Sequence, residues 1–118
     1  MLQKPKSLID KKSFELAMMA VSYSKVLRYS KDFEMASQLL RSGTSVMANV
    51  LESRYAESKK DFLHKRQIAL KEASELSGWI QLCQEHPSLP DPPEEFAILC
   101  KENLSILLAA LRTMRTNK

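Results

Sequence analysis

The chain has 118 residues, of which 44% are apolar and 27% charged, and its formal net charge is +4. This length fits one domain, residues 1–118, and the apolar content suffices for a core, which excludes a wholly disordered chain. No run of about 18 apolar residues occurs, so we expect no membrane partner, and the mild positive charge alone identifies no polyanionic partner.

Residue usage predicts an all-α fold. Glycine occurs only as Gly43 and Gly78, whereas leucine, alanine, lysine and glutamate, which favour helices, are abundant. No proline lies between residues 10 and 86, so nothing in that stretch forbids long helices.

The first helix is predicted over residues 12–29, after a basic segment, residues 1–11, that we expect to form a flexible arm. Its apolar residues fall into two stripes at helical spacing, which predicts a helix packed on two sides. One stripe contains Phe14, Ala17, Met18 and Val21, and the other contains Leu16, Ala20, Tyr23 and Leu27.

A short polar connection leads to a second helix, predicted over residues 34–54. The third helix is predicted over residues 59–86, because Ser58 and Asp61 resemble a capping box and a heptad-like apolar seam follows them. That seam contains Phe62, Ala69, Ala73, Leu76, Ile80 and Cys83.

Residues 86–93 contain four prolines and cannot continue a helix. We expect Asp91 to cap a fourth helix over residues 93–115, with Pro92 in its first turn. Because the connections are short, the four segments predict an antiparallel up-down-up-down four-helix bundle.

An unusual polar stripe follows one side of the second helix. Its members are mostly small and uncharged, whereas a solvated face would more often carry lysine and glutamate. They are Gln38, Ser42, Ser45, Asn49 and Glu52, with Arg41 beside them.

Three interpretations of this stripe compete. We favour a structural one, in which small residues such as Gly43 and Ala48 admit a neighbouring helix while Asn49 and Glu52 join a hydrogen-bonded network at a helix or subunit contact. In the second, the stripe and Arg41 line a groove for a ligand or nucleic acid, although no aromatic platform accompanies them. In the third it is ordinary exposed surface.

Residues suited to catalysis or metal binding are few. His64 and His86 have no carboxylate or cysteine at ligand spacing, and Glu72 and Glu75 lack the histidine of a di-iron motif. The chain also has no nucleophile motif and no glycine-rich phosphate loop. We therefore expect no enzymatic activity, no metal and no cofactor.

The two cysteines help to predict the cellular compartment of the protein. Cys83 and Cys100 lie among helical apolar residues without the spacing of a metal site or a disulfide framework. The first residues contain no continuous apolar segment of the kind that signal peptides have. A cytoplasmic location is therefore expected.

The most basic local region surrounds the connection between the second and third helices. Its candidate phosphate-binding residues are Arg54, Lys59, Lys60, Lys65 and Arg66. We favour a solvated helix face over a nucleic-acid site here, because only Tyr55 and Phe62 supply aromatic rings.

Several motifs together resemble a known family. They are QLLRSGTSVMANVLE at residues 38–52, SKKDF at residues 58–62, IALKEASE at residues 68–75, and Trp79. They resemble the bacterial four helix bundle protein family, also called the 23S rRNA intervening-sequence protein family, over nearly the whole chain.

The resemblance implies an up-down-up-down bundle that assembles into a ring, typically a homopentamer, without demonstrated enzymatic activity. Relatives include the accessory protein of diversity-generating retroelements, a basic pentameric barrel that binds nucleic acid and reverse transcriptase. The residues that match the family motifs, which we interpret as architectural, are Arg41, Ser45, Asn49, Glu52, Asp61, Phe62, Lys71, Glu72 and Glu75.

Two functional hypotheses follow. The first is a non-enzymatic ring that scaffolds a complex and presents basic residues to RNA or DNA. The alternative is a protein-only assembly module that binds a segment of a partner protein. A small-molecule hydrolase ranks far behind both.

Overall fold

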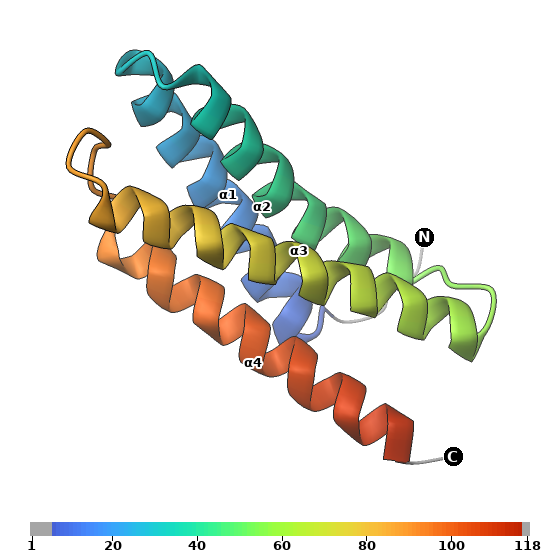
Figure 1. Ribbon diagram of the computed structural model, residues 1–118. Helices are drawn as coiled ribbons and strands as arrows, with labels where there is room; N and C mark the ends of the chain where they lie inside the picture. Colours follow the sequence, from blue (N-terminus) through green and yellow to red (C-terminus); the bar gives the residue numbers. More distant parts are fainter. Residues whose placement is uncertain (1–5, 117–118) are drawn as a thin grey trace.

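The computed structural model describes residues 6–116, and these form four α-helices packed as an antiparallel bundle (Figure 1). The helices are α1 (Leu8–Tyr29), α2 (Phe33–Ser53), α3 (Lys59–Glu85) and α4 (Glu94–Thr116). The contacting pairs are α1–α2, α2–α3, α3–α4 and α1–α4, which is the neighbour pattern of an up-down-up-down bundle. The predicted fold class is confirmed.

The start of α1 differs from the prediction. Ser7 Oγ accepts a hydrogen bond from the Asp10 amide at 3.3 Å, and Asp10 Oδ2 accepts one from the Ser7 amide at 2.8 Å. This capping box satisfies free amides of the first turn, so the helix begins at Leu8. Residues 8–11 are therefore helical rather than part of a flexible arm; residues 1–5 of the expected arm lie outside the described residues.

The other helix ends lie within one residue of their predicted positions. Ser58 caps α3 as expected, with its hydroxyl accepting from the Asp61 amide at 3.0 Å. The cap of α4 was wrongly predicted: the helix begins at Glu94, and the Phe96 amide donates to the Pro93 carbonyl at 3.0 Å. The run of prolines delays the helix past Asp91, because a residue that precedes proline is biased away from helical geometry.

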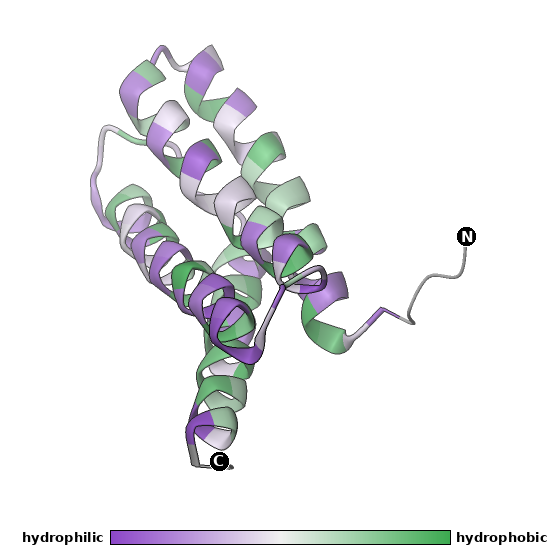
Figure 2. Cartoon of the chain, turned by 90° about the vertical axis from the view of Figure 1, so that its right-hand side faces the viewer, coloured by the Kyte–Doolittle hydropathy of each residue, from purple (hydrophilic) through white to green (hydrophobic). Residues whose placement is uncertain are grey.

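The core lies along the bundle axis, and apolar and polar segments alternate along the helices (Figure 2). Large side chains with almost no exposure come from every helix: Leu16, Leu27, Leu39, Val46, Val50, Leu76, Phe96 and Leu107. None of the helices described between residues 6 and 116 has an apolar stretch of the kind needed to cross a membrane.

The helices α1 and α2 approach each other closely at Gly43. A Cβ atom placed on Gly43 would lie 2.4 Å from the Ala20 Cβ, well inside van der Waals contact. Two small residues thus set the separation of α1 and α2.

Candidate functional site

A polar cluster joins α2 to α3 in the middle of the bundle. Arg41 Nη1 donates to both carboxylate oxygens of Glu72, at 3.1 and 3.3 Å, and Arg41 Nη2 pairs with Glu75. The Trp79 indole donates to Glu75 Oε1 at 3.1 Å. One arginine of α2 therefore binds two carboxylates that lie one turn apart on α3.

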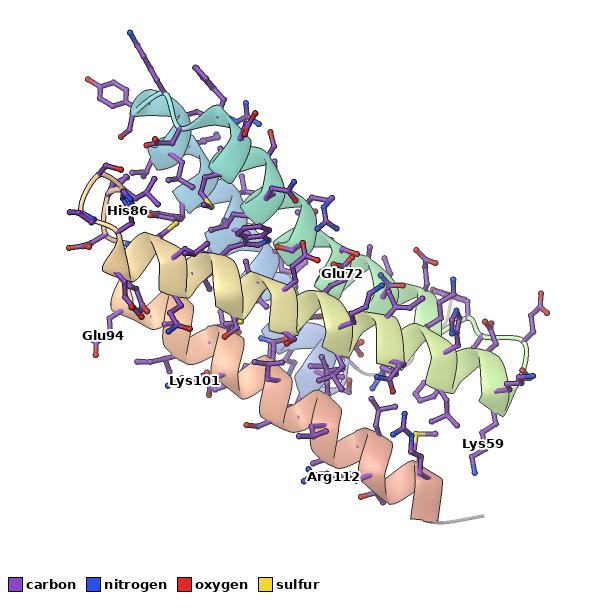
Figure 3. The ribbon with its side chains drawn as sticks, viewed as in Figure 1. Lys59, Glu72, His86, Glu94, Lys101 and Arg112 are labelled. Atoms are coloured by element: carbon purple, nitrogen blue, oxygen red, sulfur yellow. The ribbon has the colours of Figure 1, made fainter. Side chains whose placement is uncertain are left out.

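Glu72 is the buried member of this α2–α3 polar cluster (Figure 3). Its side chain is 11% exposed, whereas that of Arg41 is 50% exposed. The Ser45 hydroxyl adds a hydrogen bond to Glu72 Oε2 at 3.3 Å. Because a buried carboxylate is costly without such partners, the cluster stabilises the α2–α3 contact.

The predicted stripe on α2 divides into three parts. Arg41 and Ser45 face α3, as just described. Ser42 is buried, but its hydroxyl donates to carbonyls of its own helix, and Asn49 Nδ2 donates to Ser45 of the same helix. The remaining two residues, Gln38 and Glu52, are exposed.

Glu72, Glu75 and Trp79 complete the cluster. The family resemblance included all three and implied an architectural role for the two acids, but none of them was assigned to the predicted polar stripe. The available signal was a pair of acids three positions apart on α3, which places both on one helix face. Nothing in the spacing of α3 alone identifies Arg41 as their partner.

The candidate phosphate-binding residues gather at one end of the bundle, where ion pairs and a ring contact involve Arg54, Lys65 and Arg66. Arg54 pairs with Asp10 of α1 at 3.4 Å, and Lys65 pairs with Glu52 at 3.0 Å. Arg66 donates to Ser53 Oγ at 2.8 Å and stacks 4.6 Å from the Phe62 ring centre. The last two, Lys59 and Lys60, are exposed.

Both cysteine thiols are buried. Burial raises the pKa of the Cys83 thiol and raises that of Cys100 to about 12, so both thiols are poor nucleophiles near neutral pH. Residues 6–116 hold no cluster of three or more histidine, cysteine or acidic side chains suited to a metal ion.

An apolar surface runs along the outer side of α1 and α2, and we call it the α1–α2 apolar face. Phe14 and Met18 of α1 are 56% and 58% exposed, Val21 lies one turn further on, and Leu51 of α2 is 51% exposed. Of the two predicted apolar stripes of the first helix, one packs in the core, while Phe14, Met18 and Val21 of the other are exposed. Periodicity shows that both stripes are apolar but not what covers them.

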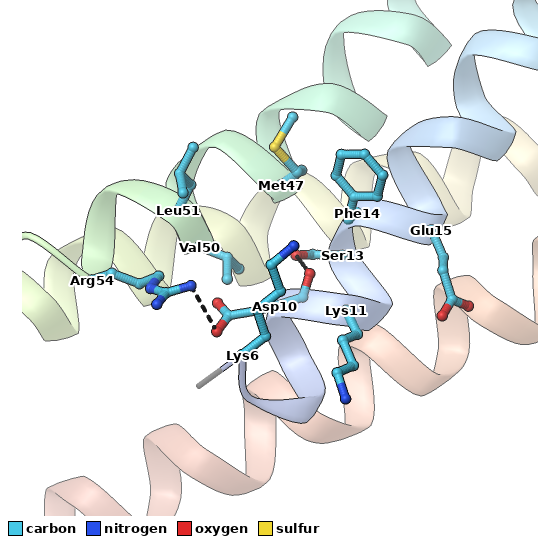
Figure 4. A pocket seen from close by; sticks show the side chains of 10 residues that line it. All are labelled: Lys6, Asp10, Lys11, Ser13, Phe14, Glu15, Met47, Val50, Leu51 and Arg54. Atoms are coloured by element: carbon cyan, nitrogen blue, oxygen red, sulfur yellow. Dashed lines mark hydrogen bonds and ion pairs between the residues drawn. The ribbon is translucent and has the colours of Figure 1, made fainter. Parts of the chain in front are cut away.

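A groove of about 440 Å³ opens between α1 and α2 beside this face (Figure 4). Phe14, Met47, Val50 and Leu51 supply its apolar lining. Charged residues also line it: Lys6, Asp10, Lys11, Glu15 and Arg54. The groove thus combines an apolar surface with charges of both signs.

Comparison with known proteins agrees with this geometry. The family model described as 23S rRNA-intervening sequence protein matches residues 6–108. A crystal structure of a protein of unknown function from the S23 ribosomal protein family of Bacteroides thetaiotaomicron is 34% identical, with a TM-score of 0.82, over 88% of this chain and 98% of that one. No curated protein matches the chain.

Proposed function

Because this chain belongs to the 23S rRNA-intervening sequence protein family, we propose that it is a non-enzymatic, ring-forming helical bundle that acts as a binding scaffold. The observation that supports self-association is the α1–α2 apolar face. The fivefold ring that the family resemblance implies is part of this proposal.

The composition of the face favours contact with protein over contact with water. Five outward positions of α2 carry no charge: Leu40, Thr44, Met47, Ala48 and Leu51. Two of them, Met47 and Leu51, line the same groove as exposed Phe14 of α1. Contiguous apolar surface of this kind commonly marks an interface, and its burial contributes roughly 25 cal/mol per Å².

A ring constrains how this face is used. In a cyclic assembly of more than two subunits, each copy presents one face to a different surface of the next copy. The α1–α2 apolar face is then one half of the contact, and the scaffold's ligand occupies surface that the contact leaves open.

Light scattering coupled to size exclusion tests self-association. We expect the unaltered chain to elute at a multiple of its 13.5 kDa monomer mass, about fivefold for a pentamer. Met18→Glu should yield monomer, because it places a charge in the contact.

Leu82→Glu provides the matched control, since Leu82 is a comparably exposed residue, 48%, on α3. The control is expected to keep the mass of the unaltered chain. A monomeric unaltered chain, or dissociation by Leu82→Glu but not by Met18→Glu, would contradict the proposal.

The second candidate function is a protein-only assembly module, and the groove in Figure 4 favours it. Its apolar lining suits the apolar side chains of a partner helix, and its charged residues suit that helix's polar flanks. Purification from native cells separates the candidates. A stoichiometric protein band that survives nuclease treatment supports the assembly module, whereas nuclease-sensitive ultraviolet absorbance supports a nucleic-acid scaffold.

A further inference from the structure

Charge is divided unevenly between the two ends of the bundle. One half comprises residues 6–19, 44–73 and 101–116, and it carries twelve lysines and arginines against seven acids, a net charge of +5. The other half, residues 20–43 and 74–100, carries four lysines and arginines against seven acids, a net charge of −3. We call the first half the basic end and the second the acidic end.

Figure 3 shows this division, with Lys59 and Arg112 at one end and Glu94 at the other. The segregation follows from the topology. One end of the bundle holds the N-termini of α1 and α3 and the C-termini of α2 and α4. The fold therefore brings together basic segments that are far apart in sequence.

Ion pairs within the chain do not neutralise the excess positive charge of the basic end. At the basic end Lys12, Arg54 and Lys65 each pair with one acid, and every pair cancels one charge of each sign. Lys6, Lys11, Lys59 and Lys60 are all exposed. The surplus positive charge therefore lies at the solvent surface, where it can contact phosphates.

The basic end is also hollowed. A depression of about 410 Å³ lies where the starts of α1 and α3 approach the finish of α2, and Ser7, Arg54, Lys59 and Arg66 are among its lining residues. A phosphate seated there would meet Lys59 and Arg66 of α3 and Arg54, which follows α2 and pairs with Asp10, an acid in the same lining. That arrangement favours a polyanion over an extended apolar ligand.

We propose that the basic ends form one rim of the ring and bind the phosphate backbone of RNA or DNA, while the acidic rim does not. This inference rests on the proposed ring. Copies that meet along the lengthwise α1–α2 apolar face stand side by side, and rotational symmetry then places every basic end on the same side. Five copies would carry about +25 on the basic rim and about −15 on the other. Repetition converts a weak monomer patch into many simultaneous phosphate contacts.

Two charge-matched double variants test the inference by fluorescence anisotropy, with labelled single-stranded RNA and DNA of one sequence as probes. Lys59→Gln with Lys60→Gln alters the basic end, and Lys25→Gln with Lys31→Gln alters the acidic end by the same net charge. We expect the first to weaken binding about tenfold or more and the second to change it less than about twofold, with affinity falling steeply from about 50 to 200 mM salt.

Equal losses in both variants would overturn the inference, since binding would then follow total charge and not its location. Binding that is absent at low salt or indifferent to salt would also overturn it, as would purification with an acidic protein in place of nucleic acid.

Light scattering on the same samples keeps the two proposals apart. A ring without preference for its basic end removes only this inference. A monomer removes the scaffold proposal itself. Met18→Glu, expected to be monomeric, should bind the probes more weakly than the ring, because each molecule then offers a single basic end.

Discussion

Replacing Gly43 by alanine is expected to destabilise the bundle by about 1–3 kcal/mol. The new Cβ would lie 2.4 Å from the Cβ of Ala20, and both atoms are fixed directly to helix backbones. Neither can rotate away, so α1 and α2 must separate, and the core between them loses contacts. Thermal or urea unfolding followed by circular dichroism measures the loss.

The same substitution at Gly78 is the control. A Cβ at Gly78 meets nothing within 4 Å, and the residue lies inside α3 on an exposed surface. Alanine there should raise stability by about 0.5–1 kcal/mol, because it restricts the unfolded chain and favours the helix. Similar effects at both glycines would mean that close packing does not set the separation of α1 and α2.

The existence and order of the four helices could be predicted from the sequence, because apolar seams, caps and prolines act within single segments. The wrongly predicted start of α1, at residue 12 and not Leu8, also concerns a signal within one segment. Ser7 and Asp10 have the spacing of a capping box, a local signal that starts the helix at Leu8 despite the basic composition of residues 1–11. Local signals of this kind suffice when they are weighted correctly.

The candidate site was less predictable, because its partners lie on different helices. Arg41 and Glu72 are 31 positions apart, and the helical period says which side each occupies on its own helix but not which residues meet. Met18 illustrates a further limit. Its spacing matches that of core residues, yet it is 58% exposed, because periodicity does not say whether a second surface covers it.

Arg41→Leu is expected to cost about 2–3 kcal/mol, although half of the arginine side chain is exposed. The loss arises mainly at Glu72, whose buried carboxylate would keep the hydrogen bond from the Ser45 hydroxyl at 3.3 Å but lose its arginine. Chemical denaturation of the variant beside the unaltered chain gives the change in unfolding free energy.

Two further variants test whether the loss in Arg41→Leu comes from leaving the Glu72 carboxylate buried without its arginine or only from losing an ion pair. Lys65→Leu removes a surface ion pair with Glu52, which solvent screens, and should leave the free energy of unfolding almost unchanged. The double variant Arg41→Leu with Glu72→Leu should recover most of the loss, because replacing both members of a buried pair by apolar groups is often close to neutral. If the double variant were as unstable as Arg41→Leu alone, the uncompensated carboxylate would not be the cause. The α2–α3 polar cluster would then stabilise the bundle through packing of the arginine stem.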